Sequence, residues 1–93
     1  MMPVVGHTIT LNETTIASDP EQWSDVGVGV LVLFKPEDVR EDPALSGKPV
    51  SVRTPDGRRY RRTVTRSSRR RAVALFFAGM DARDIPVGSE VKW

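Results

Sequence analysis

Arginine side chains dominate one stretch of this sequence, RRYRRTVTRSSRRR at residues 58–71. Eight of its fourteen residues are arginine: Arg58, Arg59, Arg61, Arg62, Arg66, Arg69, Arg70 and Arg71. The planar guanidinium fork matches pairs of oxygen atoms on phosphate or carboxylate groups. Residues 53–71 carry a formal charge of +8, although the whole chain is only +2 and the remainder is therefore −6. Such a separation of charge concerns association rather than folding, so the eight arginines are candidate binding residues.

Two kinds of acidic partner and one structural explanation fit these arginines. RNA or a ribonucleoprotein would be held by neutralisation of its phosphates, whereas an acidic protein partner would pair its carboxylates with them. In the structural explanation, the stretch is a solvated strand face balanced by the acidic segments 17–25 and 35–43. Tyr60 is the only aromatic residue in the stretch, which argues against a surface that reads bases by stacking. RNA binding is the favoured hypothesis, and the alternative is a protein-interaction or assembly domain with complementary acidic and basic patches.

Residues suited to catalysis or metal binding are scarce. There is no cysteine, and His7 is the only histidine. The acidic run at 37–42 lacks the alternating oxygen ligands and central glycine of a calcium loop. No Gly-x-x-x-x-Gly-Lys-Ser/Thr or Gly-x-Ser-x-Gly motif occurs, which argues against nucleotide binding and serine hydrolysis. The sequence therefore predicts a binding module without enzymatic activity, metal or cofactor.

Short apolar segments separated by turn residues are expected to position the arginines. They predict strands at residues 4–11, 27–34, 50–53, 58–66, 72–80 and 90–93. The segment 18–25 predicts one helical turn with Pro20 in its first turn. Residues 72–80 would also fit a helix, but the alternation of their apolar side chains favours a strand. The pattern indicates a single all-β domain over residues 1–93, a small closed or nearly closed antiparallel barrel of about six to seven strands.

The hairpin at the arginine stretch gives its side chains an expected orientation. Pro-Asp-Gly is a strong tight-turn signal, so the strand that follows it doubles back on the one before. Tyr60 and Val64 suit the core, so Arg59 and Arg61 are expected to point outward. Arg62 then shares the Tyr60 face and must lie at the rim, extend to water or occupy a bulge. The last three arginines are expected to cluster on the following turn.

The order of segments in residues 27–93 resembles a known domain. GVGVLVLF is followed by LSGKPVSVRTPDG, RRYRRTVTRS and RRAVALFFAGMDARDIPVGSEV. This order is similar to the second, β-barrel domain of translational GTPases of the elongation factor Tu type, here as a stand-alone domain without the GTPase domain. The residues that match its apolar strand and closing motif are Val73, Leu75, Gly79, Asp84, Ile85, Gly88 and Val91. The resemblance implies a barrel in which Ile85 anchors a loop in the core and Val91 returns the chain to it.

The resemblance also implies a kind of function. That family's domain helps to hold the acceptor end of aminoacyl-tRNA and touches ribosomal RNA, so a translation-related role is an expectation. No contact residue of the family maps onto this chain, and residues 1–25 have no counterpart in it. The longest apolar run, 26–34, is too short to span a bilayer, and the N-terminus lacks the features of a signal peptide. The chain is therefore expected to be cytoplasmic and without membrane contact, and it is also expected to be a monomer.

Overall fold

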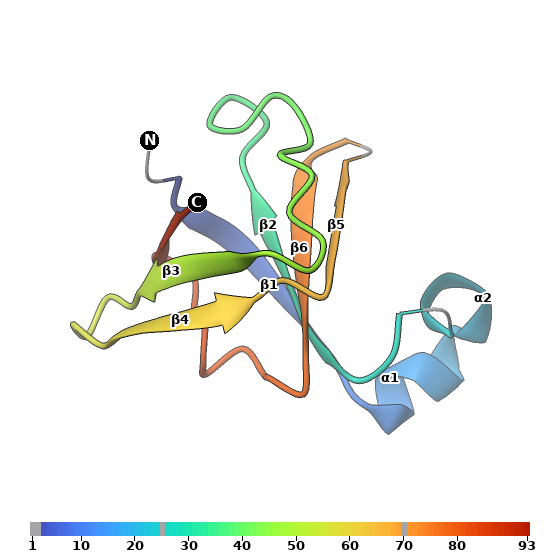
Figure 1. Ribbon diagram of the computed structural model, residues 1–93. Helices are drawn as coiled ribbons and strands as arrows, with labels where there is room; N and C mark the ends of the chain where they lie inside the picture. The colour runs from blue at the N-terminus through green and yellow to red at the C-terminus, as the bar shows by residue number, and fades with distance from the viewer. Residues whose placement is uncertain (1–2, 25, 70) are drawn as a thin grey trace.

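The computed structural model describes residues 3–24, 26–69 and 71–93, which form seven strands and two short helices (Figure 1). The strands are β1 (Val5–Leu11), β2 (Gly29–Phe34), β3 (Pro49–Arg53), β4 (Arg59–Thr63), β5 (Arg66–Arg69), β6 (Val73–Ala78) and β7 (Glu90–Lys92). The helices, α1 (Glu13–Ser18) and α2 (Pro20–Trp23), both lie between β1 and β2 in the chain. The chain is thus mostly β, as its sequence predicts.

The strands form two antiparallel sheets. One has four strands in the order β1-β2-β6-β5, and the other has three in the order β4-β3-β7. A single bridge between Val4 and Glu90 links the two, next to a hydrogen bond from the Val5 amide to the Ser89 carbonyl at 2.8 Å. The sheets do not close into one barrel in the described residues. The antiparallel β architecture is therefore confirmed, and the closed barrel stays a prediction.

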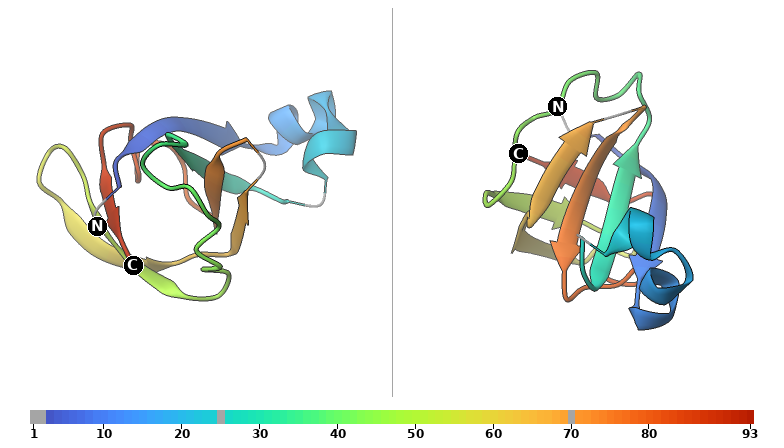
Figure 2. Two further views of the ribbon diagram at one scale, coloured as in Figure 1. Left: turned by 90° about the horizontal axis from the view of Figure 1, so that it is seen from above. Right: turned by 90° about the vertical axis from the view of Figure 1, so that its right-hand side faces the viewer.

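The inner faces of both sheets share one hydrophobic core. β3 alternates buried and exposed residues, whereas β6 is buried on both faces over Val73–Phe77. Val39 and Leu45 enter this core from the connector 35–48, which crosses one end of the strands (Figure 2). Ile85 is fully buried in the same core, and Val91 of β7 is buried there too. The two sheets thus pack face to face through this core, and their outer faces point away from it.

The arginine stretch does not form the single strand that alternation predicted for residues 58–66. β4 stops before Val64, and β5 continues in the other sheet. Val64 is fully buried at the crossing, and the Thr65 amide donates to the Phe76 carbonyl at 2.8 Å, where pairing with β6 begins. The prediction was wrong because a period of two persists when a chain passes from one sheet to the next. The strand predicted over 72–80 is confirmed as β6.

The two helices project beyond the end of the four-stranded sheet where β1 leads to β2 (Figure 1). α2 begins with Pro20 in its first turn, as predicted from the sequence. α1 was not predicted, although its N-cap signal is present: the Asn12 side chain accepts a hydrogen bond from the Thr15 amide at 2.8 Å. A helix of six residues is too short for the spacing of its apolar side chains to reveal it in the sequence.

Candidate nucleic-acid interface

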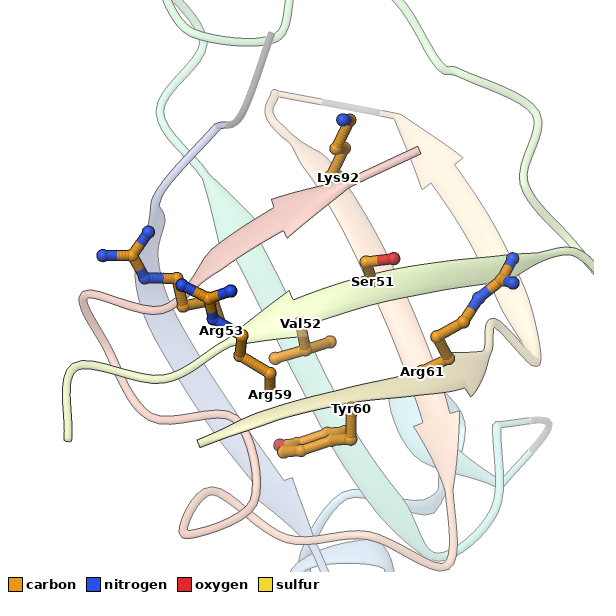
Figure 3. Close-up of a pocket in the computed structure, with 7 residues that line it drawn as sticks. All are labelled: Ser51, Val52, Arg53, Arg59, Tyr60, Arg61 and Lys92. Atoms are coloured by element: carbon orange, nitrogen blue, oxygen red, sulfur yellow. The ribbon is translucent and has the colours of Figure 1, made fainter. Parts of the chain in front are cut away.

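The outer face of the three-stranded sheet gathers cationic side chains from three strands. Val52 of β3 points into the core, so its neighbours Ser51 and Arg53 point outward. The register places Ser51 between Arg61 of β4 and Lys92 of β7. Since directly paired residues share a face, these side chains project on the same side (Figure 3).

A second row lies two residues further along the strands. Here Arg53 stands between Arg59 of β4 and Glu90 of β7. We call the exposed set Arg53, Arg59, Arg61 and Lys92, arranged around Ser51, the cationic face. It surrounds a shallow cavity of about 380 Å³, and Figure 3 shows the Arg53 and Arg59 side chains at the turn end of it. Val52 and Tyr60 also contribute to the cavity wall, although their side chains point toward the core.

Like charges oppose each other on this face. Arg53 and Arg59 are a direct cross-strand pair, an arrangement that destabilises a sheet. The ion pairs within the described residues are Arg58–Asp56 and Arg83–Asp81, so Glu90 does not neutralise its neighbour Arg53 at salt-bridge distance. The face therefore keeps a positive potential that an anionic partner would relieve.

Two of the predicted site residues help to hold the hairpin instead. The Arg58 guanidinium pairs with the Asp56 carboxylate at 3.1 Å and donates to the Arg83 carbonyl at 2.9 Å. Arg62 lies over the Tyr60 ring, with its guanidinium carbon 4.6 Å from the ring centroid, and remains exposed as expected of an extended side chain. Burial raises the pKa of Tyr60, whose hydroxyl has no hydrogen-bond partner among the described residues.

The other described arginines of the stretch lie on or beside the four-stranded sheet. Arg66 and Arg69 lie on β5, and Arg71 lies in the turn before β6. Arg70 falls outside the described residues. Close to β5, the Asp42 carboxylate accepts a hydrogen bond from the Ser67 hydroxyl at 2.6 Å, which together with the Ala44 amide lowers the pKa of Asp42. The acidic connector thus lies against β5 and leaves the cationic face clear of it.

Sequence reasoning missed Ser51, Arg53 and Lys92, the other residues of the cationic face and its centre. Arg53 and Ser51 carried a usable signal, because a hairpin around the Pro-Asp-Gly turn places them opposite Arg59 and Arg61. Lys92 carried none, because its pairing with β3 joins segments far apart in the sequence. The outward orientation of Arg59 and Arg61 was predicted correctly.

The turn that joins β3 and β4 is fixed by side-chain hydrogen bonds. The buried Thr54 hydroxyl donates to the Asp56 carboxylate and accepts from the Arg58 amide at 3.0 Å. Gly57 adopts a φ of 92°, which glycine accepts without strain. The hydrogen bond from Thr54, and then Arg58, lowers the pKa of Asp56 from its ordinary value of 3.8. The ionised Asp56 therefore stabilises the turn on which the cationic face depends.

We expect Asp56→Asn to reduce the acid sensitivity of the fold. The folded-state pKa of Asp56 lies below 3.8, so the unfolded chain takes up the proton first as the pH falls. The contribution of ionised Asp56 to the free energy of unfolding is complete above about pH 5. It is lost as the pH falls through the folded-state pKa of Asp56. Urea unfolding midpoints measured from pH 2.5 to 6 should fall less steeply for Asp56→Asn than for the wild type. Glu41→Gln, at an exposed connector position, should keep the wild-type slope, and an unchanged slope for Asp56→Asn would contradict the assignment.

The described residues contain no group of three or more histidine, cysteine or acidic side chains that could hold a metal ion. No helix in the same part of the chain is both long and apolar enough to cross a membrane. Comparisons with models of protein families, with curated proteins and with solved structures found no match to this chain. The candidate site therefore rests on geometry and charge alone.

Proposed function

We propose that this chain is a non-catalytic module that binds RNA, free or in a ribonucleoprotein, through phosphate groups held on the cationic face. The observation that supports it is the like-charge pair Arg53–Arg59 beside Arg61 and Lys92, unrelieved by an ion pair among the described residues. A sheet that only needed solubility would alternate the signs of its charges. Phosphate oxygens would supply the missing negative charge, and the guanidinium forks would bind them in pairs.

Recognition would be largely independent of base sequence. The single aromatic side chain of the hairpin, Tyr60, packs toward the core beneath the face and offers no stacking surface to a base. Arg66 and Arg71 would extend the positive surface toward the other sheet. The proposal agrees with the resemblance to the elongation-factor domain, in which the two sheets would be parts of one barrel, and with a cytoplasmic, translation-related role.

Affinity for RNA should fall steeply with salt. If the four cations of the cationic face each neutralise one phosphate, log affinity should fall with log salt at a slope of about −3 for single strands. Fluorescence anisotropy of a labelled single-stranded RNA at 50 to 300 mM salt gives the slope. A flat response would exclude phosphate neutralisation as the mechanism.

A pull-down from lysate at low salt, with and without nuclease, separates RNA from an acidic protein partner. Loss of the captured material after nuclease treatment supports the proposal. Retention of a protein partner at full yield after the same treatment would favour the protein-interaction alternative.

A further inference from the structure

The cavity on the cationic face has a small polar floor. Ser51 is the short side chain of its row, between the long side chains of Arg61 and Lys92. The Cβ atoms of cross-strand neighbours lie about 5 Å apart. Because the Ser51 side chain is short, it leaves a hollow between the longer side chains of Arg61 and Lys92. No hydrogen bond among the described residues uses the Ser51 hydroxyl, which therefore stays available to an oxygen acceptor in the hollow.

The size of the hollow limits what can enter it. The whole cavity, of which the hollow at Ser51 is a part, has a volume of about 380 Å³, near the lower end of the range for small-molecule sites. One phosphate with its attached sugar fills this volume, and a longer stretch of RNA would extend beyond it. The hollow is thus suited to a single phosphate group rather than to the length of a strand.

The charge around the hollow favours a doubly charged phosphate. Four cations line or rim it, and the one carboxylate in the same two rows belongs to Glu90. An internal phosphodiester carries one negative charge, whereas a terminal phosphomonoester carries nearly two at neutral pH because its second pKa is about 6. Coulomb attraction to the same cations is therefore about twice as large for a strand end as for an internal phosphate.

We infer that the Ser51 cavity binds the terminal phosphate of an RNA strand, with Arg53, Arg59, Arg61 and Lys92 around the phosphate and Ser51 donating from the floor. The inference rests on the proposed function and deepens it, because it adds selection of phosphorylated ends to binding that is otherwise insensitive to sequence. Arg66 on β5 and Arg71 in the turn after it would contribute to affinity for the strand but not to this selection.

The test compares RNA ends on one strand. A 12-nucleotide RNA is prepared with a 5′-phosphate, a 3′-phosphate, a hydroxyl at both ends, or a methyl ester that leaves the 5′-phosphate with one charge. Anisotropy at pH 7.5 should show at least one phosphorylated end binding about tenfold more tightly than the hydroxyl form. The methyl ester should lose most of that preference. Lowering the pH from 7.5 to 5 should reduce the preference as the phosphate takes up its second proton.

Variants assign the preference to the cavity. Ser51→Glu places a negative charge on the floor and should abolish the preference, and Lys92→Gln should reduce it. Arg40→Gln removes one exposed positive charge from the connector and should leave the preference unchanged, with thermal melts confirming that each variant is folded.

The outcomes separate this inference from the proposed function. Equal affinity for phosphate and hydroxyl ends, with salt-dependent RNA binding intact, would overturn the inference and leave the proposed function standing. An end preference that survives Ser51→Glu would also overturn it, because another surface would then hold the phosphate. Absence of binding to every RNA would overturn both.

Discussion

Replacing Arg59 and Arg61 together by glutamate should lower the affinity for single-stranded RNA by more than about 100-fold, equivalent to about 2.8 kcal/mol. The double change reverses two charges on β4, both on the exposed side of the sheet. A carboxylate at position 59 would also face Arg53 across the strand pair and compete with phosphate for it. Anisotropy at 100 mM salt measures the loss.

Stability should respond in the opposite sense. The change removes the repulsion between Arg53 and Arg59, so the free energy of unfolding should stay the same or rise. Loss of binding together with intact or increased stability would identify side chains kept for a ligand rather than for the fold. A fall in stability that matches the fall in binding would instead make the two arginines structural.

A matched pair on the other sheet provides the control. Arg66 and Arg71 are also exposed arginines close in sequence, but they lie on β5 and in the turn after it. Changing both to glutamate applies the same change in net charge and should cost less than about tenfold in affinity. A larger loss from this pair than from Arg59 and Arg61 would move the interface to the four-stranded sheet.

The local part of the site could be predicted from sequence because a hairpin is a local object. The turn residues at 54–57 fix which positions of β3 and β4 face each other, and the alternation of Val50, Val52 and Tyr60 decides which side is buried. The outward position of Arg59 and Arg61 follows from those two facts. The same reasoning extends to Ser51 and Arg53.

The rest of the site depends on contacts between distant segments. Lys92 reaches the cavity because β7 pairs with β3, and no local pattern encodes that pairing. The sequence also did not predict that the chain passes from one sheet to the other at Val64. A buried valine occurs equally within a strand and at a crossing between two sheets. The seven described arginines of the stretch therefore divide between two sheets and the turns beside them, and their density in sequence overstated the size of any single surface.

The repulsion on the cationic face is tolerated because the turn beside it is held independently. Thr54, Asp56 and Arg58 close the turn by hydrogen bonds and one ion pair that do not involve the outward arginines. Arg62 packs over the Tyr60 ring, and both side chains lie on the face of β4 opposite to Arg59 and Arg61. The hairpin can therefore keep like charges side by side, and substitutions on its outer face should change binding more than folding.

Folding should depend most sharply on a glycine where β2 meets β6. Gly29 pairs with Ala78, and a Cβ added to it would press on the Phe77 carbonyl oxygen and lie 2.9 Å from the Ala78 Cα. Phe76 Cζ would lie 2.8 Å away on the same side. Two of these three atoms are backbone of β6, so the added methyl group can be accommodated only by distorting the strand pair. No other residue type fits this position without moving a central strand.

Gly29→Ala should therefore destabilise the protein by about 3 kcal/mol, a large share of the roughly 5–14 kcal/mol expected for a domain of this length. The thermal midpoint should fall by more than about 10 °C. Gly6→Ala is the matched control on the neighbouring strand, because its added Cβ would lie 3.5 Å from the Lys35 side chain, an ordinary contact. That variant should melt within a few degrees of the wild type. Equal thermal midpoints for the two variants would mean that β2 and β6 do not approach each other this closely at Gly29. The pairing of β2 with β6 in the four-stranded sheet would then be wrong.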